Sequence, residues 1–140
     1  MQRRIIPDIT DEGGNLLELP ATATARDAAC AMRDWGVGAV LITHNGRLTG
    51  IFTECDMINR VIACDRDPRT TPLAEVMTRN PSTISPKATA LEALRLMEDG
   101  GFRHLPVVAG DRLVGIVSRR DFFGSEKARL EHESELWQRL

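Results

Sequence analysis

Two short motifs place a carboxylate three residues after a hydroxyl side chain, each directly behind an apolar segment. The first runs from Thr53 to Asp56 and the second from Ser118 to Asp121. A hydroxyl residue with an acidic residue three positions later commonly caps a helix. The same groups could hold a ligand, because a hydroxyl bonds phosphate or ribose oxygens and an ionised carboxylate accepts hydrogen bonds from vicinal hydroxyls.

The sequence around these motifs is duplicated without a gap at an offset of 65 residues. Asp121 follows Asp56 by this offset, and Met97 follows Met32 in the same way. A single motif of this kind is usually structural. Recurrence of one strand-to-helix junction in both copies favours a ligand site, although the capping and ligand roles are partly compatible.

Both junctions have features that favour an anion. The first turn of a helix exposes unpaired N–H groups at the positive end of its dipole, and we expect a helix to begin at each motif. Gly50 and Gly115, just before the hydroxyl residues, would let a ligand approach the backbone. Arg103 and His104 begin a strand after two glycines, either facing a phosphate or forming a solvated strand end.

Composition and charge narrow the class of protein. A chain of 140 residues with 42% hydrophobic and 27% charged residues fits one domain, or two half-domains sharing a core. The net charge of −2 supplies no basic field for nucleic acid or membrane surfaces. No apolar run has transmembrane or signal-peptide character. We therefore expect a cytoplasmic protein that binds neither nucleic acid nor membrane.

The three cysteines, Cys30, Cys55 and Cys64, indicate neither a disulfide framework nor a zinc site. Cys55 lies near an expected helix start, where a thiol can become more reactive. No evident base or oxyanion hole accompanies it, so an enzyme using Cys55 is a disfavoured hypothesis. We expect no catalytic residue, no metal site and no catalytic cofactor.

Apolar periodicity and turn residues predict a β-α-β-β-α unit made twice. We expect strands at 15–19 and 83–84, helices from Thr24 and Thr89, hairpins over 38–52 and 104–117, and helices from Thr53 and Ser118 with a break at Gly124. Two such units would share a core about a pseudo-two-fold axis in an α+β fold. The expected limits are 1–64 for the first repeat with its N-terminal lead-in, 65–72 for a linker, 73–124 for the second repeat and 125–140 for a C-terminal helix capped by Ser125.

The order of helix, hairpin and G-[IV]-x-[ST]-x-x-D, duplicated across residues 4–124, resembles the tandem CBS (cystathionine-beta-synthase) domain pair. Residues 76–78 (VMT), 101–108 (GFRHLPVV) and 36–42 (GVGAVLI) support this resemblance. It implies a non-catalytic regulatory module that binds adenine-containing nucleotides, commonly AMP, ATP, NAD or S-adenosylmethionine, in clefts between two repeats. It also implies a homodimer.

The resemblance assigns roles to individual residues. Thr53 and Ser118 would bond a phosphate or ribose oxygen, and Asp56 and Asp121 the ribose 2′- and 3′-hydroxyls. The remaining ligand-binding set comprises Ile84, Leu105, Ala39 and Val40 around the adenine, and Arg103 and His104 toward the phosphates, with Arg119 near the second motif. Cys55 stands where similar chains often have Arg, and Gly38-Ala39 replaces Arg103-His104, so we expect two unequal sites.

The alternative hypothesis is a dimerisation or partner-docking module whose clefts are empty. For either function we expect a homodimer and an unidentified effector protein on another chain. The dimer would use the helices after Thr53 and Ser118, with the apolar residues Met57, Ile58, Val61, Ile62, Phe122 and Phe123. Residues 125–140 would dock along one edge through Leu130, Leu136, Trp137 and Leu140, and deleting 126–140 should leave nucleotide binding intact.

Overall fold

The computed structural model describes residues 3–10 and 16–138, except the side chains of 133–135, 137 and 138. The chain forms two compact units, residues 15–81 and residues 1–14 with 82–140. They are called the first-repeat unit and the second-repeat unit here, after the sequence repeat that each contains. Trp137 and Leu140 of the expected docking stripe lie outside the described side chains. Within the described part, no helix is long and apolar enough to cross a bilayer.

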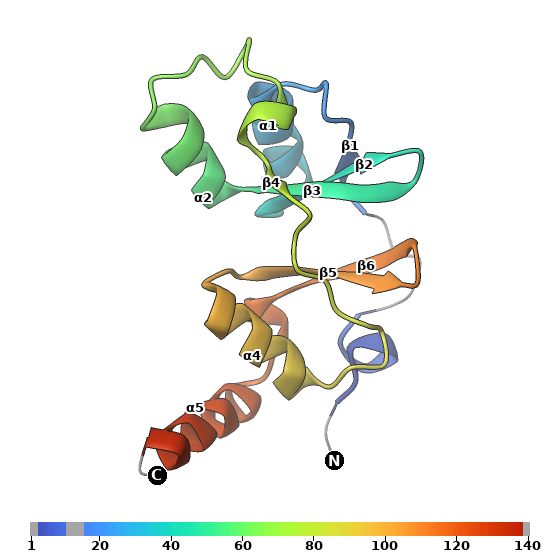
Figure 1. Ribbon diagram of the computed structural model, residues 1–140, viewed down its shortest axis with the longest axis vertical. Helices are drawn as coiled ribbons and strands as arrows, with labels where there is room; N and C mark the ends of the chain where they lie inside the picture. Colours follow the sequence, from blue (N-terminus) through green and yellow to red (C-terminus); the bar gives the residue numbers. More distant parts are fainter. Residues whose placement is uncertain (1–2, 11–15, 139–140) are drawn as a thin grey trace. The chain divides into compact units, whose positions relative to one another are not determined.

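The first-repeat unit is built on a four-stranded sheet (Figure 1). In sheet order the strands are β1 (Glu18–Leu19), β2 (Ala39–His44), β3 (Arg47–Thr53) and β4 (Thr78–Arg79), and the helices are α1 (Ala25–Trp35), α2 (Glu54–Asp56) continued by η2 (Met57–Ile62), and α3 (Leu73–Val76). β1 is parallel to β2, and the other pairs are antiparallel. Asn45 and Gly46 both have positive φ, as a tight two-residue hairpin turn requires.

The second-repeat unit repeats the hairpin and its preceding helix. Its elements are η1 (Ile5–Ile9), α4 (Ala90–Gly100), β5 (His104–Ala109), β6 (Arg112–Ser118), η3 (Arg119–Asp121) and α5 (Gly124–Gln138). In place of the strand expected at 83–84, Ile84 makes a single parallel bridge to Val107. The register of this hairpin shifts after Val107, and that of the first shifts after Ile42, again 65 residues earlier. The duplication therefore extends to irregular features.

The ends of α1 and α4 confirm the helix limits expected from the sequence. Thr24 and Thr89 each form a complete capping box with the acidic residue three positions later. Gly36 and Gly101 end the helices in the left-handed conformation, with φ of 66° and 71°. Glycine adopts this conformation without the steric penalty of a Cβ atom.

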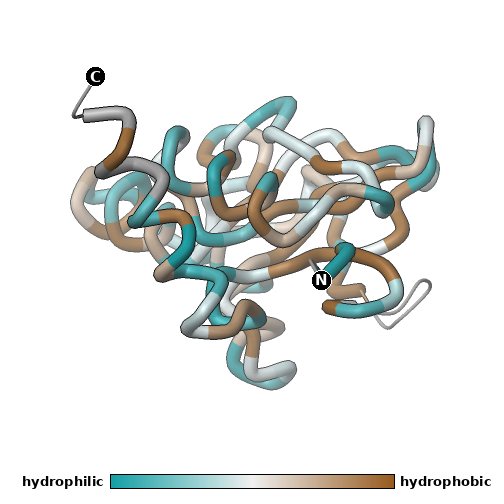
Figure 2. The backbone as a smooth tube through the Cα atoms, turned by 90° about the horizontal axis from the view of Figure 1, so that it is seen from below, coloured by the Kyte–Doolittle hydropathy of each residue, from teal (hydrophilic) through white to brown (hydrophobic). Residues whose placement is uncertain are grey.

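Each unit has its own apolar core. Along the backbone, hydrophobic stretches alternate with hydrophilic ones (Figure 2). Some apolar residues of the helices lie outside these cores. On η2, Val61 is fully buried, whereas Ile58 and Ile62 are 61% and 57% exposed because they lie on another face of the helix. On α4, Leu96 is also exposed, while Met97 beside it is buried.

Each unit is completed by the segment with which the other sequence repeat begins. The Leu73 N–H donates to the Ala23 carbonyl at 2.8 Å, and the Ile5 N–H donates to the Ala88 carbonyl at 2.9 Å. Leu73 and Ile5 are both fully buried. These two residues are 68 positions apart, although their acceptors keep the offset of 65. The compact units consequently have limits that differ from the repeat limits expected from the sequence.

Alanine is expected to have different effects on the free energy of unfolding at the equivalent positions Gly50 and Gly115. A Cβ atom at Gly50 would lie 2.6 Å from Met77 Sδ and 3.0 Å from the Thr78 carbonyl oxygen, whereas at Gly115 the nearest atom, Thr10 Cγ2, is 3.5 Å away. We expect Gly50→Ala to lower the free energy of unfolding by about 1–3 kcal/mol through overpacking. Gly115→Ala is the matched control. It should leave the free energy of unfolding unchanged or raise it by about 0.4–1 kcal/mol, because alanine reduces the conformational entropy of the unfolded chain. Urea unfolding checks both values, and equal losses would contradict the geometry.

Candidate functional site

At the first junction, where β3 passes into α2, the two motif side chains bond each other. Asp56 Oδ2 accepts hydrogen bonds from the Thr53 backbone N–H at 2.9 Å and from Thr53 Oγ1 at 3.1 Å. The Asp56 N–H donates to Thr53 Oγ1 at 3.3 Å. The capping box expected from the sequence is confirmed, and the Asp56 side chain is only 15% exposed.

Arg60 adds a contact at this junction that the sequence analysis missed. Its Nε lies 3.6 Å from Asp56 Oδ1, so both carboxylate oxygens have a partner. Its Nη1 donates to the carbonyl oxygens of Val76 at 3.3 Å and Met77 at 3.0 Å. The i, i+4 spacing of Asp56 and Arg60 is a recognised helical pairing signal and could have found this contact.

At the second junction, where β6 passes into η3, the motif hydroxyl is not hydrogen-bonded. The Ser118 N–H donates to Asp121 Oδ2 at 2.7 Å, as at the first junction. Ser118 Oγ is buried and faces the Asp121 N–H within a capping box, but it makes no hydrogen bond of full strength. Asp121 is exposed, and no arginine or lysine of the described chain forms an ion pair with it. This junction therefore retains hydrogen-bonding capacity that the first has used internally.

The helix expected to begin at Ser118 ends after one turn. η3 is a single 3-10 turn, and Phe122 returns to extended backbone with φ −96° and ψ 146°. Phe122 is buried in the core of the second-repeat unit, which explains the break. One turn aligns few peptide dipoles, so the expected dipole attraction for an anion at Ser118 is corrected to a minor contribution.

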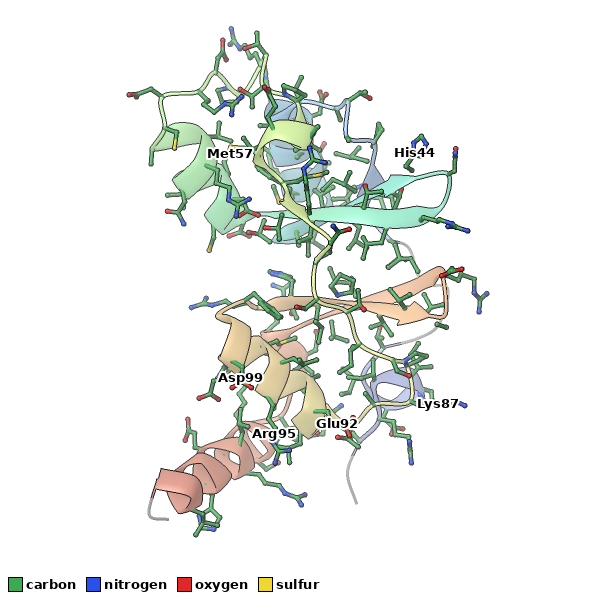
Figure 3. All side chains as sticks on the ribbon, viewed as in Figure 1. His44, Met57, Lys87, Glu92, Arg95 and Asp99 are labelled. Carbon is green, nitrogen blue, oxygen red and sulfur yellow. The ribbon has the colours of Figure 1, made fainter. Side chains whose placement is uncertain are left out.

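The hairpins bring further expected ligand residues beside each motif. Ala39 lies directly opposite Thr53 across β2 and β3, and His104 lies opposite Ser118 across β5 and β6. The strand starts and the motifs thus meet at one end of each hairpin. His44 lies at the other end of the first hairpin, by the turn (Figure 3).

At both junctions, the residue that follows the hydroxyl residue donates a backbone hydrogen bond to the residue just before the first strand of the hairpin. The Glu54 N–H donates to the Gly38 carbonyl at 3.1 Å, and the Arg119 N–H donates to the Arg103 carbonyl at 2.9 Å. The Arg103 side chain is exposed and Arg119 is partly buried. Arg103, expected toward a phosphate, and Arg119, expected near the second motif, therefore have neighbouring backbones in the second-repeat unit.

The residues expected to surround an adenine are buried apolar residues of their own units. Val40 and Leu105 are fully buried, and Ala39 and Ile84 are 5% and 6% exposed. Val40 belongs to the first-repeat core, and Leu105 and Ile84 belong to the second. Core packing accounts for the burial of these three side chains without a ligand, so their contact with a base stays a prediction.

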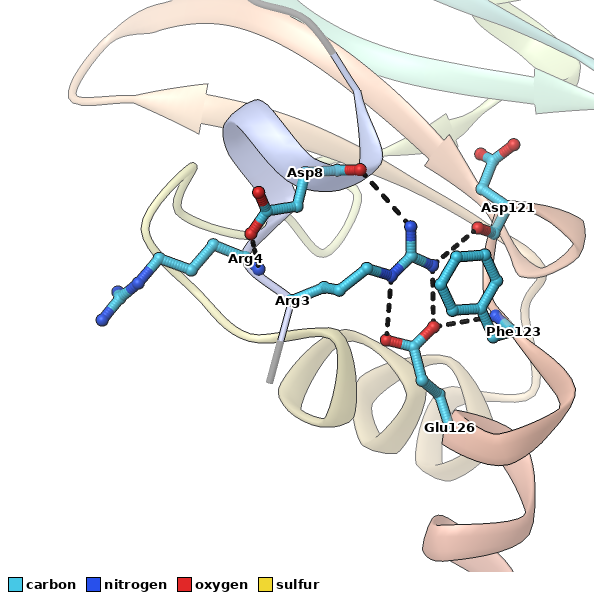
Figure 4. A network of polar contacts seen from close by, with 6 residues as sticks. All are labelled: Arg3, Arg4, Asp8, Asp121, Phe123 and Glu126. Carbon is cyan, nitrogen blue, oxygen red and sulfur yellow. Dashed lines mark hydrogen bonds and ion pairs between the residues drawn. The ribbon is translucent and has the colours of Figure 1, made fainter. Parts of the chain in front are cut away.

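The N-terminal segment is fixed to the second junction by Arg3, Phe123 and Glu126, here called the N-terminal clasp (Figure 4). Arg3 donates from Nε to Glu126 Oε2 at 3.2 Å and from Nη2 to Glu126 Oε1 at 2.8 Å. Its guanidinium carbon lies 3.5 Å from the centre of the Phe123 ring. Nη2 also donates to the Asp121 carbonyl oxygen at 3.2 Å. A motif residue is thus connected to the beginning of the chain.

The start of α5 is capped by a different residue from the one expected. The Phe123 N–H donates to Glu126 Oε1 at 2.8 Å, so the carboxylate of Glu126 satisfies a backbone donor at the helix start. α5 begins at Gly124, before the expected cap Ser125. Ser125 is therefore not the N-cap.

The clasp predicts a pH dependence of stability. The hydrogen bonds from Arg3 lower the pKa of Glu126, and partial burial of the carboxyl acts in the opposite direction. Glu126 in an unfolded chain titrates at about pH 4.3, so its stabilising contribution is fully present above that pH. The contribution disappears as pH falls through the lower folded pKa.

The measurement is the free energy of unfolding between about pH 6 and pH 3, the range spanning this titration. Glu126→Gln should flatten the fall in stability on acidification. The exposed Glu131 on the same helix provides a matched control, since Glu131→Gln should leave the profile unchanged. Identical pH profiles for the unmodified protein and both variants would show that protonation of Glu126 is not coupled to folding.

No metal site or disulfide is found in the described part of the chain. Among these residues, no group of three His, Cys, Asp or Glu side chains is placed to hold a metal ion. Cys30, Cys55 and Cys64 are free thiols.

Comparison with known proteins gives a consistent picture. The profile of the CBS domain matches residues 3–63 and 73–126. A CBS domain-containing protein of Arabidopsis thaliana is 37% identical over 120 residues, which are 85% of this chain and 22% of that protein. The chain thus spans about a fifth of the length of this curated relative.

Two solved structures are similar over most of the chain. A CBS domain protein from Pyrobaculum aerophilum, solved in complex with AMP, has 27% identity and a TM-score of 0.74, with 84% of this chain and 92% of that chain covered. A hexameric CBS-CP12 protein from bloom-forming cyanobacteria has 26% identity and a TM-score of 0.77, with 86% and 70% covered. These similarities confirm the α+β fold with two copies of one domain.

Proposed function

We propose that this chain, which belongs to the CBS domain family, binds an adenine-containing nucleotide at its hydroxyl–carboxylate junctions and transmits the binding to a regulated protein. Its two CBS domains form a regulatory module rather than a catalytic one. The similar Pyrobaculum protein was solved with AMP, which supports the adenine class of ligand. AMP, ATP, NAD and S-adenosylmethionine are the candidates.

The observation that carries this proposal is the unpaired Ser118 Oγ beside Asp121. A buried hydroxyl without a partner costs about 1–3 kcal/mol, and a ligand oxygen would remove that cost. The adjacent carboxylate can accept hydrogen bonds from the ribose 2′- and 3′-hydroxyls. Arg103 and Arg119 supply the positive charge that a phosphate needs.

A ligand panel tests the proposal against an empty docking module. Thermal unfolding would be followed with AMP, ATP, NAD, S-adenosylmethionine and, as a control for the base, GMP. A ligand that binds only the folded chain adds about 2.7 kcal/mol at 100 times its Kd. We expect at least one adenine compound to raise Tm while GMP does not. If none of the four raises Tm, the docking-module alternative is favoured.

We further propose a homodimer that uses the exposed face of η2. Ile58 and Ile62 lie one turn apart there and are both more than half exposed, and exposed apolar groups of this kind mark interfaces when contiguous. The similar CBS-CP12 protein is hexameric, which supports assembly in this family. Val61 and Phe122, both expected in the interface, are excluded because they are buried in the cores of their own units, with exposed fractions of 0% and 4%.

Light scattering at micromolar concentration should give the mass of two chains. The Ile58→Glu/Ile62→Glu variant should give the mass of one, because charges in an apolar interface would be desolvated without partners. Asn59→Glu, on the same exposed helix, is the control and should stay dimeric. A one-chain mass for the unmodified protein would contradict the proposed dimer.

A further inference from the structure

The two junctions differ in whether their carboxylate is already engaged. Asp56 Oδ2 accepts from Thr53 and Asp56 Oδ1 pairs with Arg60. At the second junction Asp121 Oδ2 accepts from the Ser118 N–H, and no lysine or arginine of the described residues pairs with this carboxylate. The Thr53 hydroxyl is bonded, whereas the Ser118 hydroxyl is not.

Arg60 is itself held at the first junction by two backbone carbonyls. The bonds to Val76 and Met77 fix its guanidinium beside Asp56. A ribose hydroxyl that approaches Asp56 Oδ1 would compete with this guanidinium for the same oxygen. Because Arg60 is 48% exposed, solvent weakens the pair, which is worth a factor of about two to five in an equilibrium constant.

The charges beside the motifs differ in the same direction. At three equivalent positions the first junction has Gly38, Glu54 and Cys55, and the second has Arg103, Arg119 and Arg120. The first set carries one negative side chain and the second carries three positive ones. Charges within about 8 Å act on a phosphate with little screening at physiological salt, so an anionic ligand is favoured at the second junction.

We propose that the second-repeat junction is the primary nucleotide site and that Arg60 disfavours ligand binding at the first-repeat junction by pairing with Asp56. This inference rests on the proposed nucleotide function and adds which junction is used and which residue restrains the other. Arg60 acts through Asp56 and is a positioning residue. The second junction has Ser125 at the position equivalent to Arg60, and the nearby Arg3 donates to the Asp121 carbonyl oxygen rather than to its carboxylate.

Calorimetric titration with AMP of the full chain tests the first half of the inference. We expect one AMP per chain in the tight phase, with an affinity little changed in Asp56→Ala and reduced about 13- to 160-fold in Asp121→Ala. Two equal sites, or this reduction in Asp56→Ala instead, would overturn the inference while leaving the proposed function intact. No AMP binding to the folded chain would overturn the inference, and the proposed function fails as well if ATP, NAD and S-adenosylmethionine also leave Tm unchanged.

The role of Arg60 is tested in the Asp121→Ala background, where AMP binding reports the first junction. Arg60→Met should strengthen this residual binding two- to five-fold, because the carboxylate is released. Arg33→Met removes an equal charge from an exposed pair with Asp34 and should change nothing. Unchanged or weaker binding in the Arg60 variant would overturn the restraining role. If that variant does not fold by circular dichroism, Arg60→Gln takes its place, because an amide can still donate to the Val76 and Met77 carbonyl oxygens but carries no charge toward Asp56.

Discussion

Replacing Asp121 with alanine is expected to weaken AMP binding by about 1.5–3 kcal/mol, the range for hydrogen bonds to a charged group. The carboxylate of Asp121 is exposed and bonded only through Oδ2 to the Ser118 N–H, so it can accept further hydrogen bonds from a ribose. Asp56→Ala should cost less, because Thr53 and Arg60 already engage that carboxylate.

Calorimetry on the two variants at matched salt gives the comparison directly. Asp111→Ala, in the turn between β5 and β6, provides a control for loss of a carboxylate elsewhere in the same unit. Raising the salt concentration should weaken ligands with more phosphates more strongly, since positive side chains surround the second motif. Equal losses for Asp56→Ala and Asp121→Ala would show that the internal contacts of the first junction do not matter.

Leu130→Ala is expected to lower the free energy of unfolding by about 2–5 kcal/mol, the range for large-to-small changes in a core. Leu130 is 4% exposed and belongs to the core cluster of the second-repeat unit. Its helix, α5, packs against α4. The C-terminal helix is therefore part of the core and not an appendage docked along one edge.

Chemical denaturation of Leu130→Ala and Leu136→Ala separates these two roles. Leu136 is 48% exposed, so its replacement should change the free energy of unfolding by less than about 0.5 kcal/mol. Deleting residues 126–140 would remove Leu130 and the clasp residue Glu126, so we expect it to destabilise the second-repeat unit. That this deletion leaves nucleotide binding intact stays a prediction. Equal effects of the two leucine variants would contradict a core role for α5.

Much of the fold could be predicted because the duplication repeats local signals that act over a few residues. Capping threonines, terminal glycines and the Asn45-Gly46 turn each dictate backbone conformation locally, and the structure confirms them. The segments around Ile5 and Leu73 could not be placed, because their contacts are distant in sequence and their offset of 68 departs from that of the repeats.

The candidate site likewise has parts that the sequence predicts and parts that it does not. The motifs and the strand residues beside them follow from the repeat, and the hairpin registers place them together. Arg3 and Glu126 are 123 residues apart, and no local pattern connects them. The break at Phe122 also depends on tertiary structure, because a buried aromatic residue overrides a helix start that the local sequence favours.

The most direct test of nucleotide binding through hydroxyl–carboxylate junctions is calorimetric titration of the unmodified chain with AMP and with its 2′,3′-dideoxy analogue. AMP should bind. The analogue, which lacks both hydroxyls that the carboxylates are proposed to bond, should bind more weakly by about 1.5–3 kcal/mol, as in Asp121→Ala. Equal affinity for the two compounds, or no binding of AMP to the folded chain, would contradict this account.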